Sequence, residues 1–120
     1  MLTIYEEKRN GTRRVLATDE PGSGNAHHEY RIDHATEFAG STLGKISFQK
    51  GPILEAGVNG VHNEDLLAIV QHRLECFQSG PFRCDENEAA LNCVKASLSI
   101  LKARTNRRVL AGTEGTHNGN

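Results

Sequence analysis

The chain has 120 residues, which is enough for one domain with a modest hydrophobic core. Charged residues make up 24% of it and the formal net charge is −1, so the composition does not indicate a nucleic-acid-binding protein. Only 5% of the residues are aromatic, none is Trp, and 37% are hydrophobic, which is little for so short a chain. Because self-association buries additional apolar surface, we expect a homo-oligomer.

The cysteines are three in number and none has CxxC spacing: Cys76, Cys84 and Cys93. Together with the lack of a secretory apolar segment at the start, this pattern predicts a reduced cytosolic protein. Two interpretations of the thiols are open, namely small buried residues or a zinc site completed by His62 or His72. No apolar run of 18 residues is present, so no transmembrane helix is predicted.

The first half of the chain has the character of β-strands. Four segments have suitable composition: 3–9, 12–19, 28–35 and 42–51. Asn10-Gly11, between the first two, is the dipeptide best suited to a two-residue type I′ hairpin turn. The glycine-rich segment GPILEAGVNGVHNED (51–65) follows the last expected strand. It either lets the backbone approach another group closely or is a plain linker.

From Asn63 onward the apolar residues recur at helical spacing. Asn63 is the predicted N-cap, and Glu64 and Asp65 place negative charge in the first turn, where the helix dipole favours it. Gly80-Pro81 is expected to end this helix. Its apolar stripe consists of Leu66, Leu67, Val70, Leu74 and Phe77.

A second helix is predicted from Asp85, with Glu88 completing a capping-box-like pair, to about Leu110. It would be about 39 Å long. Because its partner is shorter, its last turns extend beyond the hairpin and must be covered or form a binding surface. Gly112 is the expected C-cap. The heptad-type seam of this helix consists of Leu91, Val94, Leu98 and Leu101.

The predicted fold class is therefore α+β, as one domain. A small N-terminal antiparallel β-sheet region covers residues 1–61 and a C-terminal two-helix hairpin covers residues 62–111. The tail, residues 112–120, is rich in Gly and polar residues and is expected to be flexible.

The last turns of the second helix carry a cluster of basic residues: Lys102, Arg104, Arg107 and Arg108. Arg104 and Arg108 are four residues apart on one helical face, where like charges mildly repel each other. One interpretation is a solvated helix end whose cations match the dipole. The other is an anion site in which guanidinium groups bind phosphate oxygens. If two protomers brought this face together, the doubled charge would need a multivalent anion.

Phe77 and Phe82 lie in the connection CFQSGPFRCDEN (76–87), although helix connections are usually polar. The end of one helix and the start of the next are neighbours in a hairpin, so Phe77 is expected beside Asn87. A phenyl face can stack on a purine, and a carboxamide can pair with a base edge or a ribose hydroxyl. Phe77 also continues the apolar stripe, so a core role is open too. Phe82 is interpreted as a staple that fixes the loop.

The sequence contains none of the common catalytic or metal-binding motifs, such as GxSxG, a Walker loop, HxH or HExxH. No catalytic residue, metal ligand or cofactor is therefore predicted.

The segment KISFQKGPILEAGVNGVHNEDLLAIVQHRLECFQSGPFRCDENEAAL, with RTNRR and AGTEGTH after it, resembles the phage anti-Thoeris proteins that act as sponges for cyclic ADP-ribose isomers. The helical hairpin is also similar to that of a phage anti-CBASS sponge. The resemblance covers about residues 44–117, whereas residues 1–43 match only in general character. The sequence departs from the family at His72, where an acidic residue is common. It also departs in the stretch NCVKASLSI, which is more polar than usual in the family.

The resemblance implies a phage-encoded protein of the host cytoplasm that sequesters cyclic nucleotide immune signals without cleaving them. It implies homo-oligomers, from dimer to hexamer, with separate pockets for cyclic ADP-ribose isomers, such as glycocyclic ADP-ribose, and for cyclic di- and trinucleotides. No membrane or nucleic-acid partner is expected. The adenine-side contacts of the family fall on Phe77 and Asn87, and the phosphate-side arginines fall on Arg104 and Arg108. Two other functions are open: an enzyme that degrades these nucleotides, and a structural or nucleic-acid-binding module.

Overall fold

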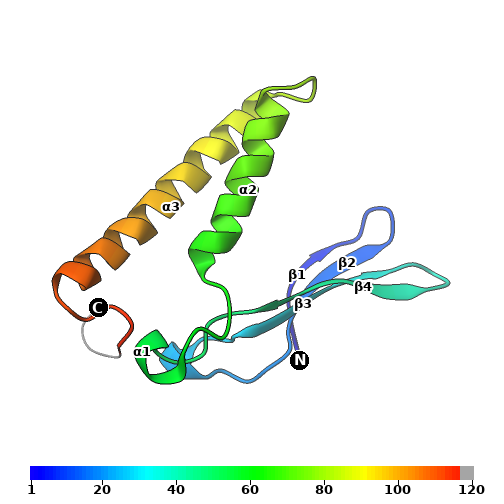
Figure 1. Ribbon diagram of the computed structural model, residues 1–120. Coiled ribbons are helices and arrows are strands. Elements are labelled where there is room, and N and C mark those ends of the chain that lie inside the picture. Colours follow the sequence, from blue (N-terminus) through cyan, green and yellow to red (C-terminus); the bar gives the residue numbers. More distant parts are fainter. Residues whose placement is uncertain (117–120) are drawn as a thin grey trace. The chain divides into compact units, whose positions relative to one another are not determined.

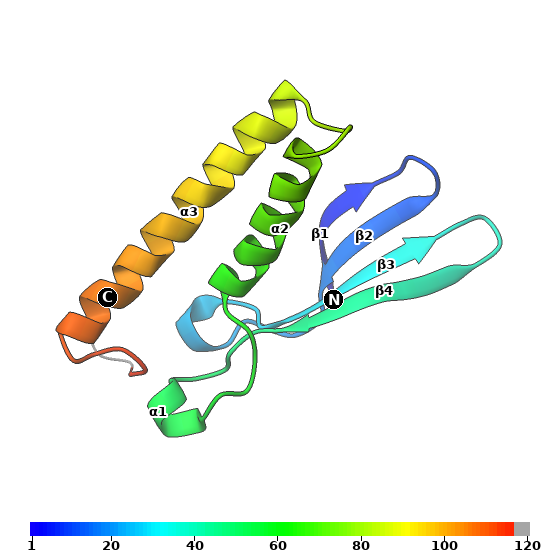
Figure 2. The same cartoon turned by 45° about the horizontal axis from the view of Figure 1, so that its top comes forward.

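The computed structural model describes residues 1–116. The chain divides into two compact units, residues 1–61 and the part from His62 onward. In Figures 1 and 2 the first unit is a β-sheet with a short helix, and the second is a helical hairpin. These elements confirm the predicted α+β class.

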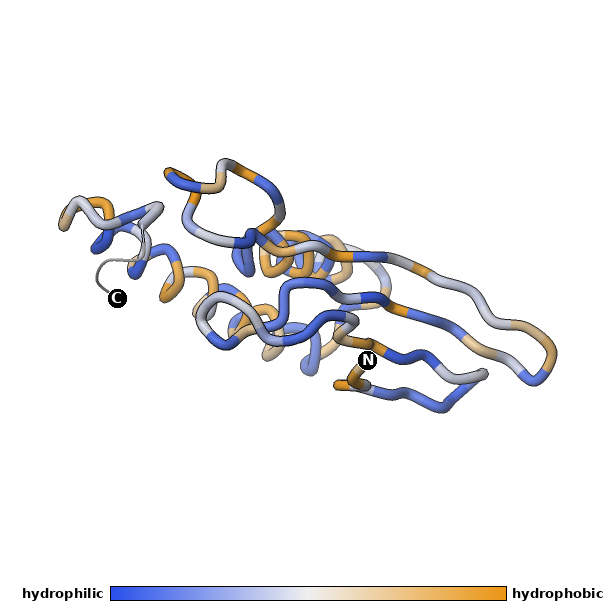
Figure 3. Tube along the Cα trace, turned by 90° about the horizontal axis from the view of Figure 1, so that it is seen from below, coloured by the Kyte–Doolittle hydropathy of each residue, from blue (hydrophilic) through white to orange (hydrophobic). Residues whose placement is uncertain are grey.

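The sheet is an antiparallel meander in the order β1-β2-β3-β4. Its strands are β1 (Leu2–Glu7), β2 (Thr12–Ala17), β3 (Glu29–Ala35) and β4 (Gly40–Ser47). A short 3-10 turn, η1 (Ser23–Asn25), lies between β2 and β3. Figure 3 shows polar and apolar residues mixed along the strands, as expected for a sheet that is largely exposed to solvent.

The first hairpin differs from the predicted two-residue turn. Asn10 and Gly11 both have positive φ, at 58° and 90°, as a type I′ turn requires. However, the last paired residues before the turn are Glu7 and Arg13, so the connection is longer. The Glu7 carboxylate accepts hydrogen bonds from the Arg9 backbone N–H at 3.0 Å and from its Nε at 3.2 Å. These local bonds stabilise a turn that begins before Asn10.

Side-chain ion pairs link neighbouring parts of the sheet. Arg14 Nε donates to Glu6 at 2.6 Å across β1 and β2, and Arg31 Nε donates to Asp33 at 2.8 Å along β3. The hydrogen bond from Arg31 lowers the pKa of Asp33. The Glu29 carboxylate accepts from the Ser47 hydroxyl at 2.5 Å, which lowers the pKa of Glu29.

The glycine-rich segment after β4 is more ordered than a plain linker. It contains a single helical turn, α1 (Ile53–Ala56), which the sequence did not predict and which ends at Gly57 with φ +73°. A Cβ on Gly60 would lie only 2.5 Å from the carbonyl carbon of Phe48. Gly60 therefore permits the close backbone approach through which Phe48 pairs with Val61. This confirms the interpretation that the glycines of this segment let the backbone approach another group closely.

The second unit consists of α2 (Asn63–Gln78) and α3 (Asp85–Leu110), which pack against each other. The N-cap of α2 is His62, one residue before the predicted Asn63, because the Asp65 carboxylate accepts the His62 backbone N–H at 2.9 Å. The predicted pairing of Asp85 with Glu88 is also wrong, since the N-cap of α3 is Cys84. Glu88 instead accepts from Gln78 Nε2 at 3.1 Å.

The seam between α2 and α3 is longer than predicted. Leu91 and Leu98 are buried, Val94 and Leu101 are half-buried, and the same spacing continues through Thr105 to the buried Arg108. Within residues 1–116 the buried apolar side chains are Leu16, Ala17, Leu91 and Leu98. The chain therefore has a small core in each of its two units, whereas its length and composition indicated one modest core.

All three cysteines are exposed, so the interpretation as small buried residues is wrong. Their apolar character is tolerated at the surface, where scattered small hydrophobic residues are common. Among the residues that the structure describes, no cluster of three or more His, Cys, Asp or Glu side chains could hold a metal ion. None of the described helices combines the length and apolarity needed to cross a bilayer.

Candidate functional site

The tip of the helical hairpin carries an aromatic and cationic cluster. Phe77, in the last turn of α2, is half-buried, and its ring centroid lies 6.3 Å from that of Phe82 at an interplanar angle of 50°. The Arg73 guanidinium lies over the Phe77 ring at 5.4 Å from its centroid. Phe82 thus contacts Phe77, as expected of a residue that fixes the loop. Arg73 was not predicted, although its position four residues before Phe77 places both on one helical face.

Gln78 holds this tip in shape. Its amide oxygen accepts the Cys84 backbone N–H at 3.1 Å, and its amide nitrogen donates to Glu88 at 3.1 Å. The second bond joins the residue after Phe77 to the residue after Asn87, so both predicted contacts lie at the same end of the hairpin. Asn87 is half-buried in the first turn of α3. Its carboxamide has no hydrogen-bond partner among residues 1–116 and is available to a ligand.

At the other end of α3, the two predicted arginines have different environments. Arg104 is exposed and forms no ion pair with any residue in the described part of the chain. Arg108 is only 7% exposed. Its Nε donates to Glu114 at 3.2 Å, and its Nη2 donates to the carbonyl oxygens of Thr113 and Thr116 at 2.7 and 2.8 Å.

The segment after α3 folds back because Gly112 has φ +73°. The Thr113 backbone N–H then donates to the Arg108 carbonyl at 2.9 Å, and Arg108 holds residues 113–116 against the helix end. Sequence reasoning missed this arrangement, whose signal is an acidic residue, Glu114, two positions after Gly112. The C-cap of α3 is Ala111, one residue before the predicted Gly112. His117, the last residue of the EGTH block, lies outside the described residues, as does the rest of the tail predicted to be flexible.

The predicted site residues therefore form two groups at opposite ends of α3. At about 1.5 Å per residue, Asn87 lies about 26 Å from Arg104 and about 32 Å from Arg108 along the helix axis. Phe77 and Asn87 are at the tip, with Arg104 and Arg108 at the far end. One hairpin does not bring the four side chains together.

A second stripe with heptad spacing runs along the outer face of α3. Its residues, all exposed, are Ala89, Cys93, Ala96, Ile100, Ala103 and Arg107. At about 100° per residue this stripe lies about 150° around the helix from the seam with α2. Ile100, at its centre, is 68% exposed. Small side chains at this spacing allow another helix to approach closely.

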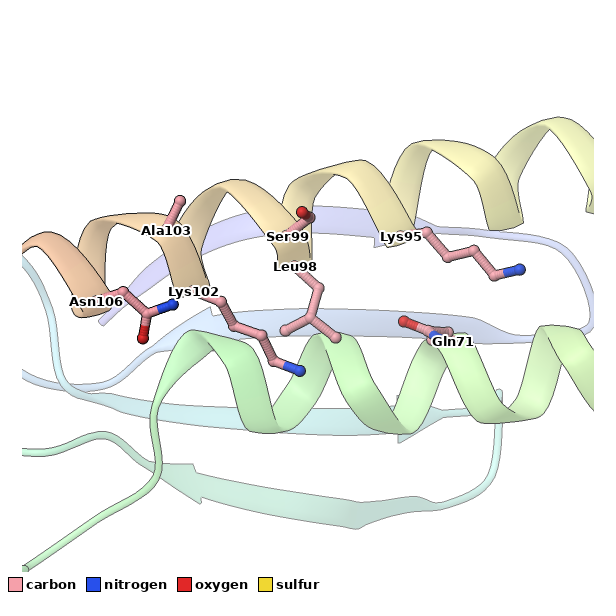
Figure 4. Close-up of a pocket in the computed structure, with 7 residues that line it drawn as sticks. All are labelled: Gln71, Lys95, Leu98, Ser99, Lys102, Ala103 and Asn106. Carbon is pink, nitrogen blue, oxygen red and sulfur yellow. The ribbon is translucent and has the colours of Figure 1, made fainter.

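A polar groove lies beside this stripe, between α2 and α3, as Figure 4 shows. It has a volume of about 440 Å³. It is lined by Gln71 of α2 and by Lys95, Leu98, Ser99, Lys102, Ala103 and Asn106 of α3. Two of these side chains are cationic and none is acidic.

The chain was compared with known proteins, and no family model matches it. It is 47% identical over 81 residues to Thoeris anti-defense 1 of Bacillus phage SBSphiJ7. The aligned part makes up 68% of this chain and 56% of the relative, so the chain spans little more than half the length of that protein. The similarity agrees with the resemblance noted in the sequence and supports membership of the phage anti-Thoeris family.

Proposed function

We propose that this protein inhibits Thoeris defence by sequestering a cyclic nucleotide immune signal, which it binds without cleaving. The observation that carries the proposal is the 47% identity to a protein named Thoeris anti-defense 1. Cyclic ADP-ribose isomers, such as glycocyclic ADP-ribose, are the ligands that the family resemblance implies. These molecules combine a purine, two riboses and a diphosphate, so their site needs both a stacking surface and cations.

The hairpin tip supplies the surface for the base. The Phe77 ring is half-buried, which leaves part of it free to stack on adenine, and Phe82 and Gln78 hold it in place. The free carboxamide of Asn87 can both donate to and accept from a base edge or a ribose hydroxyl. Arg73 adds positive charge at the ring. Aromatic stacking on a rigid tip reduces the entropy lost on binding.

The far end of α3 supplies the cations for the diphosphate. Arg104 is exposed and has no competing carboxylate in the described part of the chain. Its guanidinium fork matches two phosphate oxygens. Arg108 contributes to phosphate binding in one of two ways. Either its guanidinium exchanges Glu114 for a phosphate, or it holds residues 113–116 in place at the end of α3 that carries Arg104.

Two copies of the chain complete the site. The outer stripe of α3 is symmetric about the level of Leu98, because Ala96 and Ile100, Cys93 and Ala103, and Ala89 and Arg107 are equidistant from it. An antiparallel two-fold pair of α3 helices would therefore match each small residue with another member of the stripe. Such a pair brings the hairpin tip of one chain to the axial level of the last turns of the partner's α3, with Asn87 about 8 Å along the axis from the partner's Arg104. At about 100° per residue Asn87 itself lies on the seam side of α3, so a shared ligand must extend from the tip around α3 to reach the partner's Arg104.

Charge complementarity favours the same antiparallel arrangement. The first turn of α3 is acidic, with Asp85, Glu86 and Glu88, and its last turns are basic. Antiparallel pairing brings the acidic start of one helix beside the basic end of the other, whereas parallel pairing brings like charges together. Glu86 would lie about one helical turn, along the axis, from Arg107 of the partner subunit. The dimer thus has two equivalent pockets, each with a tip from one chain and arginines from the other.

Cyclic di- and trinucleotides, and with them inhibition of CBASS, belong to the same proposal. Their support is the resemblance of the helical hairpin to that of an anti-CBASS sponge. Assembly beyond the dimer, up to the hexamer, also follows from the family resemblance.

The test is recovery of the ligand. The protein is incubated with glycocyclic ADP-ribose, separated from free ligand, and denatured, and the released nucleotide is identified by mass spectrometry. Sequestration predicts intact ligand in stoichiometric amount, in parallel with loss of Thoeris effector activation. A linearised or hydrolysed product, either bound or in the unbound fraction, would instead indicate an enzyme, and recovery of all the nucleotide unbound and unchanged would contradict both.

A further inference from the structure

The groove between α2 and α3 has no role in the function proposed above. Its volume of about 440 Å³ lies within the range of small-molecule sites. It is formed within the helical hairpin alone, by α3 and one residue of α2, Gln71. Of its members, only Ala103 also belongs to the outer stripe of α3, so the groove borders that stripe and does not coincide with it.

The groove is positively charged without internal compensation. Lys95 and Lys102 line it, no carboxylate does, and neither ammonium forms an ion pair within residues 1–116. By contrast, Lys50 of the sheet lies 3.2 Å from Glu29. Two uncompensated cations beside a low-dielectric helix seam attract an anion more strongly than isolated surface lysines do.

The remaining side chains indicate what kind of anion fits. Lys95 and Lys102 are separated by about 10 Å along α3, from the helical rise. Figure 4 shows Leu98 between them, pointing toward α2. Leu98 is 8% exposed and offers a small apolar floor. Ser99, Asn106 and Gln71 add a hydroxyl and two carboxamides around this floor. A free phosphate would fill only part of the space and would use neither the floor nor the amides.

This surface is separate from the arginine end of the proposed pocket. Lys95 and Arg104 are nine residues apart, which at about 100° per residue places them on opposite sides of α3. A ligand held by the two lysines therefore does not contact Arg104 of the same chain.

We infer that the groove is a second binding site, for a linear nucleoside diphosphate. The ammonium groups of Lys95 and Lys102 bind the phosphoryl oxygens, and the nucleoside lies over Leu98. The carboxamides of Gln71 and Asn106 bind its polar edges. The inference does not rest on sequestration of cyclic nucleotides.

The experiment is a titration of the full chain with ADP as the probe, followed by two-dimensional amide NMR and by calorimetry. The variant is Lys95→Ala/Lys102→Ala, with Lys95→Arg/Lys102→Arg as the charge-conserving partner. Lys45→Ala, an exposed lysine of β4 without an ion pair in the described part of the chain, is the matched control for loss of a cation. Unfolding midpoints of all variants establish that each one folds.

The inference predicts that ADP shifts the amide signals of Lys95, Ser99, Lys102 and Asn106 and the side-chain amide of Gln71. It predicts at least about tenfold weaker binding in the double alanine variant, because two charge-assisted contacts are lost. The arginine variant and Lys45→Ala should bind within about twofold of wild type. Shifts confined to Phe77 and Arg104 would overturn the inference while leaving the proposed function intact, and so would equal affinity in the double alanine variant.

Discussion

Arg108 and Glu114 form an ion pair across the end of α3, with 3.2 Å between Arg108 Nε and Glu114 Oε2. The arginine side chain is only 8% exposed, while that of Glu114 is 36% exposed. The same guanidinium also donates to the carbonyl oxygens of Thr113 and Thr116. Arg108 thus holds the end of α3 together, independently of any contact that it makes with a ligand.

Arg108→Ala should therefore lower the free energy of unfolding by about 2 kcal/mol, because it leaves carbonyl groups and a carboxylate without their charged donor. Arg104→Ala, at an exposed position of the same helix, should change it by less than about 0.5 kcal/mol. Chemical denaturation followed by circular dichroism measures both values. Equal destabilisation by the two variants would show that the ion pair does not hold the helix end.

Phe77→Ala should weaken binding of glycocyclic ADP-ribose by about tenfold or more, because stacking on an aromatic ring contributes about 1–3 kcal/mol per base. Phe77→Tyr keeps the ring and should retain most of the affinity. Phe38→Ala, which removes a 91% exposed phenylalanine of the sheet unit, serves as the matched control and should bind like wild type. Calorimetry distinguishes the three variants, and undiminished binding by Phe77→Ala would exclude the tip as the base site.

Ala96→Glu should abolish self-association, because it places a charge at the centre of the outer stripe of α3. Ala68→Glu makes the same change at an exposed position of α2 and should leave association unchanged. Sedimentation velocity reads out the oligomeric state. If Ala96→Glu associates like wild type, the stripe is not the interface.

The antiparallel pairing of two α3 helices is tested by exchanging the charges of Glu86 and Arg107. Glu86→Lys and Arg107→Glu should each weaken the dimer, since each brings like charges together across the interface. The double variant should restore association to near the wild-type level. A double variant weaker than either single variant would contradict the antiparallel pairing.

The sheet unit should lose stability in acid. The pKa of Asp33 is lowered by its hydrogen bond from Arg31, and that of Glu29 by its hydrogen bond from Ser47. Because the folded-state pKa lies below the unfolded value, the contribution of each group is present at neutral pH and is lost as the pH falls below about 4. Asp33→Asn and Glu29→Gln should reduce the drop in unfolding midpoint between neutral and acidic pH. An unchanged drop in both would mean that other carboxylates cause it.

Local patterns were enough to predict the strands, the two helices and the stripe from Leu91 to Leu101. The second helix begins at Asp85 as predicted, but the caps of both helices were misjudged, because backbone N–H groups at both helix starts found partners other than the expected caps. The turn α1 was missed because four residues carry too little periodicity to be recognised. The Arg108 arrangement could not be predicted from helical spacing, since it depends on how residues 113–116 fold back after Gly112.

The most direct measurement is complementation between two binding-deficient variants, Phe77→Ala and Arg104→Ala, mixed after reversible dissociation and titrated with glycocyclic ADP-ribose. In a symmetric dimer whose pockets combine the tip of one chain with the arginines of the other, each mixed dimer regains one intact pocket. Shared pockets therefore predict that about one quarter of the wild-type number of tight sites returns on mixing, although neither variant alone has any. If mixing restores no tight sites, each pocket lies within a single chain and the shared-pocket account is wrong.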